Sequence, residues 1–234
     1  MLLRPIQLAL FDAQSLFRES IYLFLSRQRN INVVIQAKNP SDLFNKLDST
    51  QADIILMDFL MPGIQGGEVV ETILMKYPSV KIIGLSNTTN VDVISSLLDY
   101  GIHGFVSKFD EPDELLSTIE AVFEDRACKT NLFIEALYHN RQKVLRSDSN
   151  RSQVLLSDRE KMILQLVWEE KSNKEIASEL FLGVRTVERM RLELKEKIGV
   201  KSTVGLIRYA VEKNILKNFP DSADNTKYLR SNRH

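Results

Sequence analysis

The sequence predicts an α/β domain with a doubly wound, five-stranded parallel sheet, followed by a smaller all-α domain. Short apolar runs alternate with amphipathic stretches up to about residue 125, a pattern that indicates strands alternating with helices. Four helical stretches without strands follow after about residue 154. A polar, charged segment between the two parts is typical of a linker.

The expected strands of the first part are short and mostly apolar, as in a sheet covered on both faces. They are residues 6–11, 33–35, 54–58, 81–86 and 104–108. Helical spacing of apolar residues predicts the helices between them. These are residues 15–27, 40–47, 67–76, 91–100 and 111–124.

Four of these strands end on polar or charged residues, namely Asp12, Asp58, Ser86 and Lys108. The carboxyl ends of parallel strands meet at one edge of a sheet, where ligands bind. Two carboxylates there suit a hard cation such as Mg²⁺, and a hydroxyl and an ammonium suit a phosphoryl group. One carboxylate can act as a nucleophile and form an aspartyl phosphate. Taken alone, an Asp in the position of Asp58 would more often simply start the Met-Pro-Gly turn after its strand.

The first part resembles the receiver domain of two-component response regulators. The resemblance covers about residues 5–125 and is carried by Asp12, the 57–63 segment, Gly66-Gly67, Ser86, Gly101, Gly104-Phe105 and Lys108. It implies a flavodoxin-like fold and phosphorylation of Asp58 by a sensor histidine kinase. Asp12, Asp58 and the Leu60 carbonyl are then the implied Mg²⁺ ligands. Ser86 and Lys108 are the implied residues of the phosphate switch.

Three residues depart from that family's pattern. Ala13 stands where the family commonly has a second metal-binding acid, so we expect weak Mg²⁺ binding unless the Gln14 amide replaces it. Asn87 replaces a small residue and is expected to crowd the phosphate, and Phe109 replaces a proline. We therefore expect either weak phosphorylation of Asp58 or signalling without phosphate.

Two aromatic residues, Tyr100 and Phe105, allow two interpretations. Either they belong to the output face that the resembling receivers use, or they are ordinary core or partly exposed aromatics.

The proposed divisions of the chain follow these patterns. Residues 1–126 form the receiver, 127–153 a linker with a possible short helix, 154–217 the second domain, and 218–234 a tail without structure. Residues 141–152 are polar and charged, so we expect them to be exposed and mobile.

The second domain begins with a capping box, Ser157-x-x-Glu160, which predicts a helix from about residue 158. Its expected inner face is Met162, Ile163, Leu166 and Val167. Further helices are expected from residue 172, over 185–198 and over 203–214, with a tight turn at 181–183.

Two short helices joined by a tight turn fit a helix-turn-helix, whose second helix enters the major groove of DNA. The face of that helix away from the core is expected to present Arg185, Glu188, Arg189, Arg191, Leu192 and Lys195. Its cations suit phosphates, and Arg189 suits base edges. Because the charges have mixed signs, a solvated helix face is the alternative from charge alone.

The second domain resembles the LuxR-type DNA-binding domain over about residues 154–217. The motifs are Leu156-Ser157-x-Arg159-Glu160, 172–177, Arg185-Thr186-Val187-Glu188 and 197–202. The resemblance implies a four-helix fold, dimerisation through the last helix, and DNA contacts that include Asn173, Lys174 and Thr186. Met190 and Gly183 depart from the pattern, and Gly183 lacks the hydroxyl that usually caps the recognition helix.

Bulk properties agree with a soluble, cytoplasmic regulator. Residues 1–150 carry 14 Lys and Arg against 19 Asp and Glu, a net of −5, and residues 151–234 carry 17 against 12, a net of +5. An acidic half followed by a basic half suggests a control module joined to a nucleic-acid reader. No apolar run is long enough to span a membrane, and the single Cys128 forms no internal disulfide.

Together these features predict a transcriptional response regulator of the NarL/LuxR type. Its receiver, phosphorylated on Asp58, controls homodimerisation and binding to double-stranded DNA. The alternative is an atypical regulator that signals without phosphate through a protein partner or constitutive dimerisation. An enzyme is not expected, because phosphatases of the haloacid dehalogenase type carry Asp-x-Asp where this chain has Asp12-Ala13-Gln14. A scaffold that does not bind DNA is the remaining alternative.

Overall fold

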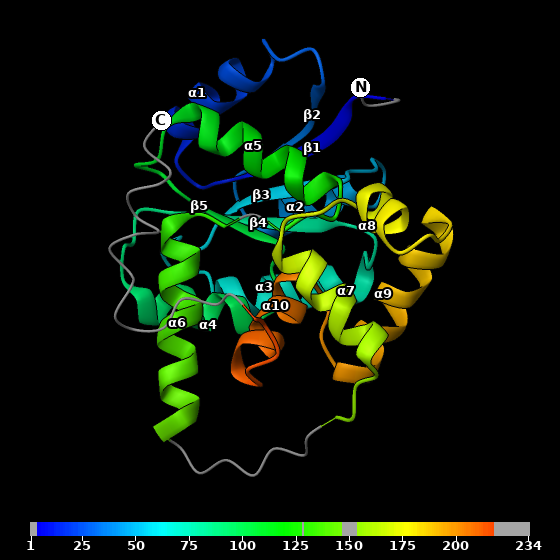
Figure 1. Ribbon diagram of the computed structural model, residues 1–234. Helices are drawn as coiled ribbons and strands as arrows, with labels where there is room; N and C mark the ends of the chain where they lie inside the picture. The colour runs from blue at the N-terminus through cyan, green and yellow to red at the C-terminus, as the bar shows by residue number, and fades with distance from the viewer. Residues whose placement is uncertain (1–3, 128, 147–153, 218–234) are drawn as a thin grey trace.

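The computed structural model describes residues 4–127, 129–146 and 154–217. Its centre is a sheet of parallel strands in the order β2-β1-β3-β4-β5 (Figure 1). The strands are β1 (Ile6–Phe11), β2 (Ile31–Ala37), β3 (Ile54–Asp58), β4 (Lys81–Ser86) and β5 (Gly104–Ser107). The strand order changes direction between β1 and β3, so their carboxyl ends open a crevice there.

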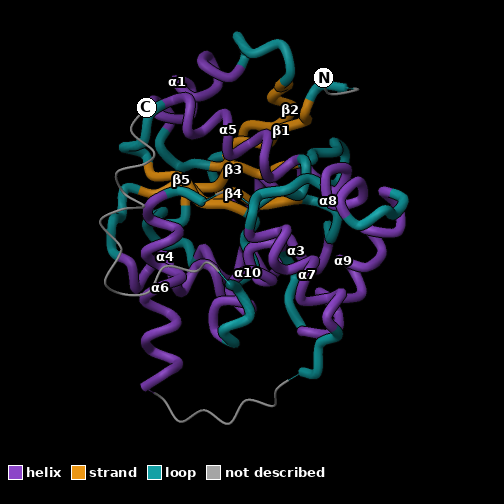
Figure 2. Tube along the Cα trace, viewed as in Figure 1, coloured by secondary structure: helices purple, strands orange, loops and turns teal. Residues whose placement is uncertain are grey.

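Helices cover both faces of the sheet, which confirms the predicted doubly wound fold (Figures 1 and 2). One face carries α1 (Ser15–Leu25) and α5 (Pro112–Phe123), and the other carries α2 (Pro40–Leu47), α3 (Gly66–Lys76) and α4 (Val91–Asp99). The second strand is longer than the three residues predicted, because it pairs with β1 along its whole length.

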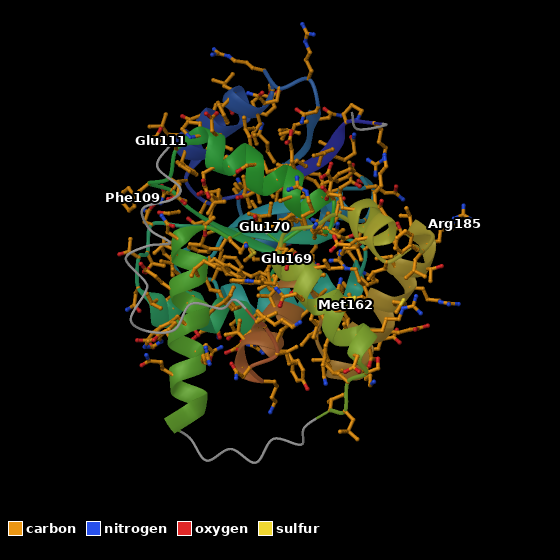
Figure 3. All side chains as sticks on the ribbon, in the orientation of Figure 1. Phe109, Glu111, Met162, Glu169, Glu170 and Arg185 are labelled. Atoms are coloured by element: carbon orange, nitrogen blue, oxygen red, sulfur yellow. The ribbon has the colours of Figure 1, made fainter. Side chains whose placement is uncertain are left out.

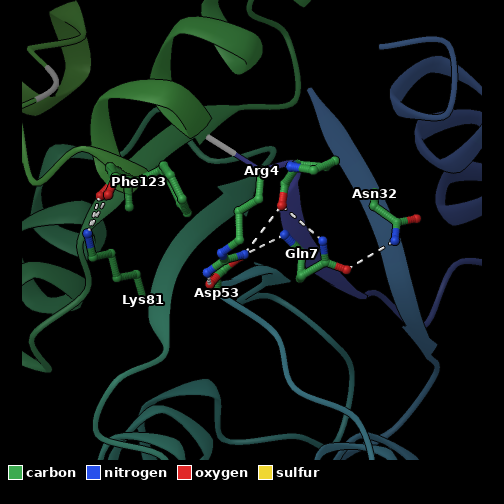
Figure 4. Close-up of polar contacts among 8 residues, drawn as sticks. Arg4, Gln7, Asn32, Asp53, Lys81 and Phe123 are labelled. Atoms are coloured by element: carbon green, nitrogen blue, oxygen red, sulfur yellow. Dashed lines mark hydrogen bonds and ion pairs between the residues drawn. The ribbon is translucent and has the colours of Figure 1, made fainter. Parts of the chain in front are cut away.

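Polar contacts close the amino-terminal edge of the sheet (Figure 4). Arg4 forms an ion pair with Asp53 at 2.6 Å, and Asp53 also accepts a hydrogen bond from the backbone N–H of Gln7. The Lys81 ammonium donates to the carbonyl oxygens of Val122 and Phe123, both at 2.8 Å. Because those carbonyls belong to the last turn of α5, Lys81 fixes the end of the receiver against the sheet.

The segment after the receiver is a long packed helix, not the short helix and mobile linker that the sequence suggested. Helix α6 spans Asn131–Arg146, so residues 141–146 are helical; residues 147–153 lie outside the described ranges. Phe133, Ala136 and Leu137 are buried, and the helix packs against α4 and α10. The helix forms because this apolar stripe has a surface to cover, which composition alone does not reveal.

The second domain contains four helices within residues 154–217. These are α7 (Asp158–Trp168), α8 (Asn173–Glu179), α9 (Val184–Ile198) and α10 (Thr203–Glu212). Both capping boxes, Ser157 with Glu160 and Ser172 with Glu175, are formed. The predicted inner face of α7 was wrong at Met162, which is 51% exposed, because the helix turns Leu164 inward instead.

The two domains share one apolar core. A continuous cluster of buried side chains runs from the α2–α4 face of the sheet through α6 and into α7–α10. Helix α10 packs against both α6 and α4 (Figure 1). The second domain therefore packs on the first by hydrophobic contact, a closed arrangement that the sequence did not predict.

Candidate functional site

The residues predicted to form a site at the carboxyl edge of the sheet do meet there. The Lys108 ammonium lies 2.7 Å from Asp12 Oδ2 and 2.8 Å from Asp58 Oδ2, so it bridges the two carboxylates. All three side chains are about 5% exposed. The bridge brings together residues from three strand ends that are 46 to 96 positions apart in sequence, as a parallel sheet requires.

Each of the four carboxylate oxygens of this pair already has a donor. Asp12 Oδ1 accepts from the backbone N–H of Gln14 at 2.7 Å, and Asp58 Oδ1 accepts from that of Leu60 at 2.9 Å. The other two oxygens accept from Lys108. Burying two charges this deeply is tolerated because every oxygen is hydrogen-bonded and a cation lies between them.

Two neighbours of this pair were not found from the sequence. Arg18 donates to the backbone carbonyl of Asp12 at 2.6 Å, and the Lys108 ammonium lies 4.1 Å from the centre of the Phe17 ring. Both residues belong to α1, whose apolar spacing predicts a helix but gives no sign of a contact with Lys108. The helical spacing of apolar residues does not show which distant side chain each of them contacts.

The predicted switch hydroxyl, Ser86, is fully buried beside this cluster. Its Oγ accepts from the backbone N–H of Thr88 at 3.1 Å, and its carbonyl accepts from the backbone N–H of Lys108 at 2.9 Å. Asn87 is exposed, and Phe109 is 74% exposed and extends away from the sheet (Figure 3). Neither side chain fills the crevice.

The residues present do not form a ready site for a divalent cation. Position 13 carries an exposed Ala with no oxygen ligand, and the oxygens of Asp12 and Asp58 are all engaged. Within the described ranges, no group of three or more His, Cys, Asp or Glu side chains is placed to hold a metal ion. The Leu60 carbonyl is the third predicted ligand, and its residue lies on the exposed rim. A cation that bound here would have to displace Lys108.

The two aromatic residues whose role was open, Tyr100 and Phe105, differ in burial. Phe105 is 2% exposed and belongs to the core. Tyr100 is 38% exposed, and its ring lies directly against the backbone of Gly67. Tyr100 therefore connects the end of α4 to the start of α3, the helix that follows the Asp58 loop.

The outer part of the predicted DNA face is open to solvent. Helix α9 exposes Arg185, Glu188, Arg189 and Leu192, and α8 exposes Lys174. Arg185 extends outward from the molecule (Figure 3), and Arg189 forms only a loose pair with Glu193 at 3.6 Å. Thr186 is half-buried near the start of α9. Cations on the exposed side of a helix-turn-helix are suited to contacting phosphates.

The sequence predicted Arg191 on that open face, but the structure places it elsewhere. It is 3% exposed and donates to Asn173 Oδ1 at 2.5 Å, Thr203 Oγ1 at 2.9 Å and the Asp125 carbonyl at 2.6 Å. It therefore joins α8, α9 and α10 to one another and to the end of the receiver. The helical period places Arg191 on the polar side but does not show that the receiver covers it.

Lys195 also points toward the receiver. Burial, together with Arg191 and Lys81, lowers the pKa of Lys195 to about 8, against the pull of Asp125. The carboxyl of Asp125 lies 3.0 Å from the Lys81 ammonium, and the surrounding cations lower its pKa despite its burial. Nearby, burial together with Lys195 and Lys81 lowers the pKa of His103 to about 3. His103 is therefore neutral, and its ring accepts from the backbone N–H of Ile82.

The last helix, the implied dimerisation element, is also covered. No residue of α10 from Thr203 to Glu212 is exposed. Arg208 of α10 forms an ion pair with Asp99 at the end of α4, and Gly101 faces the Lys201 side chain. In this conformation, α10 is bound to the receiver and offers no free face to a second copy.

Comparisons with known proteins match both halves. Residues 8–120 match the response regulator receiver domain family, and residues 154–210 match the family of bacterial regulatory proteins of the luxR type. The oxygen regulatory protein NreC of Staphylococcus aureus is 28% identical over 90% of this chain and 99% of its own length.

Solved structures show the same fold. RcsB of Salmonella typhimurium matches with a TM-score of 0.55 and 24% identity, covering 88% of this chain and 98% of that one. RcsB of Salmonella enterica serovar Typhimurium, bound to promoter rprA in the presence of the phosphomimetic BeF3⁻, matches with a TM-score of 0.54 and 24% identity over the same shares. No helix within the described residues is long and apolar enough to cross a bilayer.

The two matched families account for most of the chain in the order that the fold displays. The protein belongs to the DNA-binding response regulators of the NarL/LuxR type, with a receiver domain followed by a LuxR-type helix-turn-helix domain.

Proposed function

We propose that this protein is a transcription regulator whose receiver holds the DNA-binding domain closed until Asp58 is phosphorylated. The observation that carries the proposal is that Arg191 and Lys195 of α9 face the receiver and that α10 packs against α4 and α6. A DNA-binding dimer needs these surfaces free. RcsB, which has the same fold, is described bound to a promoter with a phosphate mimic, which agrees with this proposal.

The proposed chemistry is phosphoryl transfer to Asp58 from a sensor histidine kinase. A carboxylate oxygen of Asp58 attacks phosphorus, the donor's leaving group departs, and a mixed anhydride forms. Lys108 and the Ser86 hydroxyl are the groups suited to hydrogen-bond the new phosphoryl oxygens. Because Ala13 supplies no ligand, we expect Mg²⁺ to bind weakly.

The proposed output is release of the second domain, which then forms a homodimer on double-stranded DNA. New negative charge at Asp58 changes the pairing of Lys108 and biases a two-state contact. Gly67 and Tyr100 connect the loop after Asp58 to α4, whose end contacts Arg208 and Lys201. A DNA-binding transcription regulator of this family acts in the cytoplasm.

Labelling by a small phosphodonor tests the role of Asp58. We expect acetyl phosphate with Mg²⁺ to add one phosphoryl group to the wild-type chain and none to Asp58→Asn, measured by intact-protein mass spectrometry. Asp113→Asn, an exposed carboxylate on α5, serves as the control and should label normally. Equal labelling of all three proteins would assign the phosphate elsewhere. No labelling of the wild type would favour the alternative of signalling without phosphate.

DNA binding tests the output face. We expect Arg185→Ala with Arg189→Ala to weaken binding of the phosphorylated chain to a generic duplex and to reduce the salt slope by about 1 per lost phosphate contact. Lys161→Ala, an exposed cation on α7, is the matched control. If all variants bound DNA as the wild type does, the exposed side of α9 would not be the DNA face. If the wild type failed to bind any duplex, the scaffold alternative would stand.

A further inference from the structure

The ammonium group of Lys108 contacts two carboxylates and one aromatic ring. Two of its three N–H groups are accounted for by Asp12 at 2.7 Å and Asp58 at 2.8 Å. The face of the Phe17 ring lies 4.1 Å away, within the range of a cation–π contact. The side chain of Lys108 is 5% exposed, so water contributes little to holding it.

Phe17 is itself held in place. It packs against the apolar cluster between the sheet and α1. The next residue, Arg18, is tied to the Asp12 carbonyl at 2.6 Å, which fixes the start of α1 relative to the carboxylate pair. The ring is therefore a fixed part of the site.

We propose that Phe17 is a positioning residue that keeps Lys108 between Asp12 and Asp58 as the resident cation of the site. Lys108 takes the place of a divalent ion in the resting receiver. A divalent ion needs the same carboxylate oxygens that Lys108 occupies, so its binding requires Lys108 to leave both carboxylates and the ring. Phe17 thus lowers the affinity of the receiver for divalent cations.

The residue at position 13 favours Lys108 over a divalent ion in the competition for the two carboxylates. An acid there would add negative charge and a ligand in favour of a divalent ion, but Ala13 adds neither. One lysine charge against two carboxylates leaves a net charge of −1, which attracts a divalent ion less than an open pair would. The Phe17 ring further favours Lys108 over a divalent ion, because cation–π contacts are stronger when the ammonium is desolvated.

The test measures Mg²⁺ affinity of the full-length chain by calorimetry at constant ionic strength, without a phosphodonor. Phe17→Leu keeps apolar bulk and removes the aromatic face, and Phe17→Tyr keeps that face. Phe24→Leu makes the same change on the same helix among residues that pack in the apolar cluster. We expect Phe17→Leu to bind Mg²⁺ about three- to tenfold more tightly, and the other two variants to bind as the wild type does.

A second readout follows the lysine itself. In an isotope-labelled chain, the side-chain proton signals of Lys108 should show a ring-current shift in the wild type and in Phe17→Tyr, and lose it in Phe17→Leu. A purely structural role for Phe17 predicts weaker or unchanged Mg²⁺ binding in Phe17→Leu, and that result would overturn the proposal. An equal gain in Phe24→Leu would overturn it as well.

The inference concerns the site proposed for phosphorylation, but its test does not depend on that function. If Asp58 were never phosphorylated, the labelling experiment would fail while the Mg²⁺ titrations kept their predicted order. If the titrations showed no difference between Phe17→Leu and the wild type, labelling of Asp58 would be unaffected.

Discussion

Three cations of this protein, Lys108, Arg191 and Lys195, have different roles because their surroundings differ. Lys108 bridges two carboxylates, Arg191 joins three helices, and Lys195 is desolvated against the receiver. The strand pattern was sufficient to predict that Asp12, Asp58, Ser86 and Lys108 converge. It was not sufficient to predict the burial of Arg191 and Lys195, because the covering surface belongs to a different domain.

Lys195 makes the closed contact sensitive to pH. Its pKa is about 8 when closed, and it returns toward the ordinary value of 10.5 when the domain opens. Between these values the closed form keeps a neutral lysine while the open form takes up a proton, so rising pH favours closure. Below pH 8 the lysine is charged in both forms, and the closed contact carries the full cost of burying it.

We therefore expect the DNA affinity of the wild type to fall as the pH rises from about 8 to 9.5. The groups that face Lys195 are Asp125, Arg191, Lys81 and His103. In this window Asp125 stays charged, Arg191 stays protonated and His103 stays neutral. Lys195→Arg keeps its charge throughout and should show a flatter profile. Parallel profiles for the two proteins, measured by fluorescence anisotropy, would contradict the assignment.

At the scale of elements, the sequence predicted most helices and strands, because each carries its own apolar period and end signals. The error at α6 has a physical cause: its charged second half has few apolar residues, so the helix needs a surface to pack on, and α4 and α10 supply that surface. The contact between α3 and α4 was invisible for a related reason. It depends on the absence of a side chain at Gly67, where the ring of Tyr100 lies.

A double-mutant cycle tests this contact between α3 and α4. A methyl group at position 67 would overlap the Tyr100 ring, so Gly67→Ala alone should lower the free energy of unfolding by about 1 kcal/mol despite its better helix propensity. In Tyr100→Ala the same change should cost nothing or stabilise the protein slightly. Urea unfolding of the four proteins gives the coupling free energy. If the two substitutions changed the free energy of unfolding additively, the Tyr100 ring would be able to move aside without cost.

At the scale of the whole molecule, a receiver and a reader of DNA share one apolar core. Their families, their order and the fold of each were predictable from motifs, since each motif lies within one domain. How the domains sit on each other was not, because the contacts are pairs such as Asp99 with Arg208 that are distant in sequence and ordinary in type. The closed state therefore could not be predicted from the sequence.

The ion pair between Asp99 and Arg208 should contribute to closure. Asp99 is 60% exposed, so the pair is worth at most about 1 kcal/mol, and Asp99→Ala should raise the DNA affinity of the unphosphorylated chain by up to about fivefold. The substitution lies on the receiver and leaves the DNA-binding domain intact. Glu71→Ala, an exposed carboxylate on α3, is the control. An unchanged affinity in mobility-shift titrations would mean that apolar packing alone holds the domains together.

The covering of α10, which has no exposed residue, makes the response depend on how many copies of this protein the cell holds. Opening uncovers an apolar helix that was satisfied within one molecule, and only another molecule can cover it again. The response then depends on abundance as well as on the signal. In the proposed mechanism, an opened chain present at few copies per cell closes before it meets a second one, and at many copies the same signal is expected to yield paired, DNA-bound regulators.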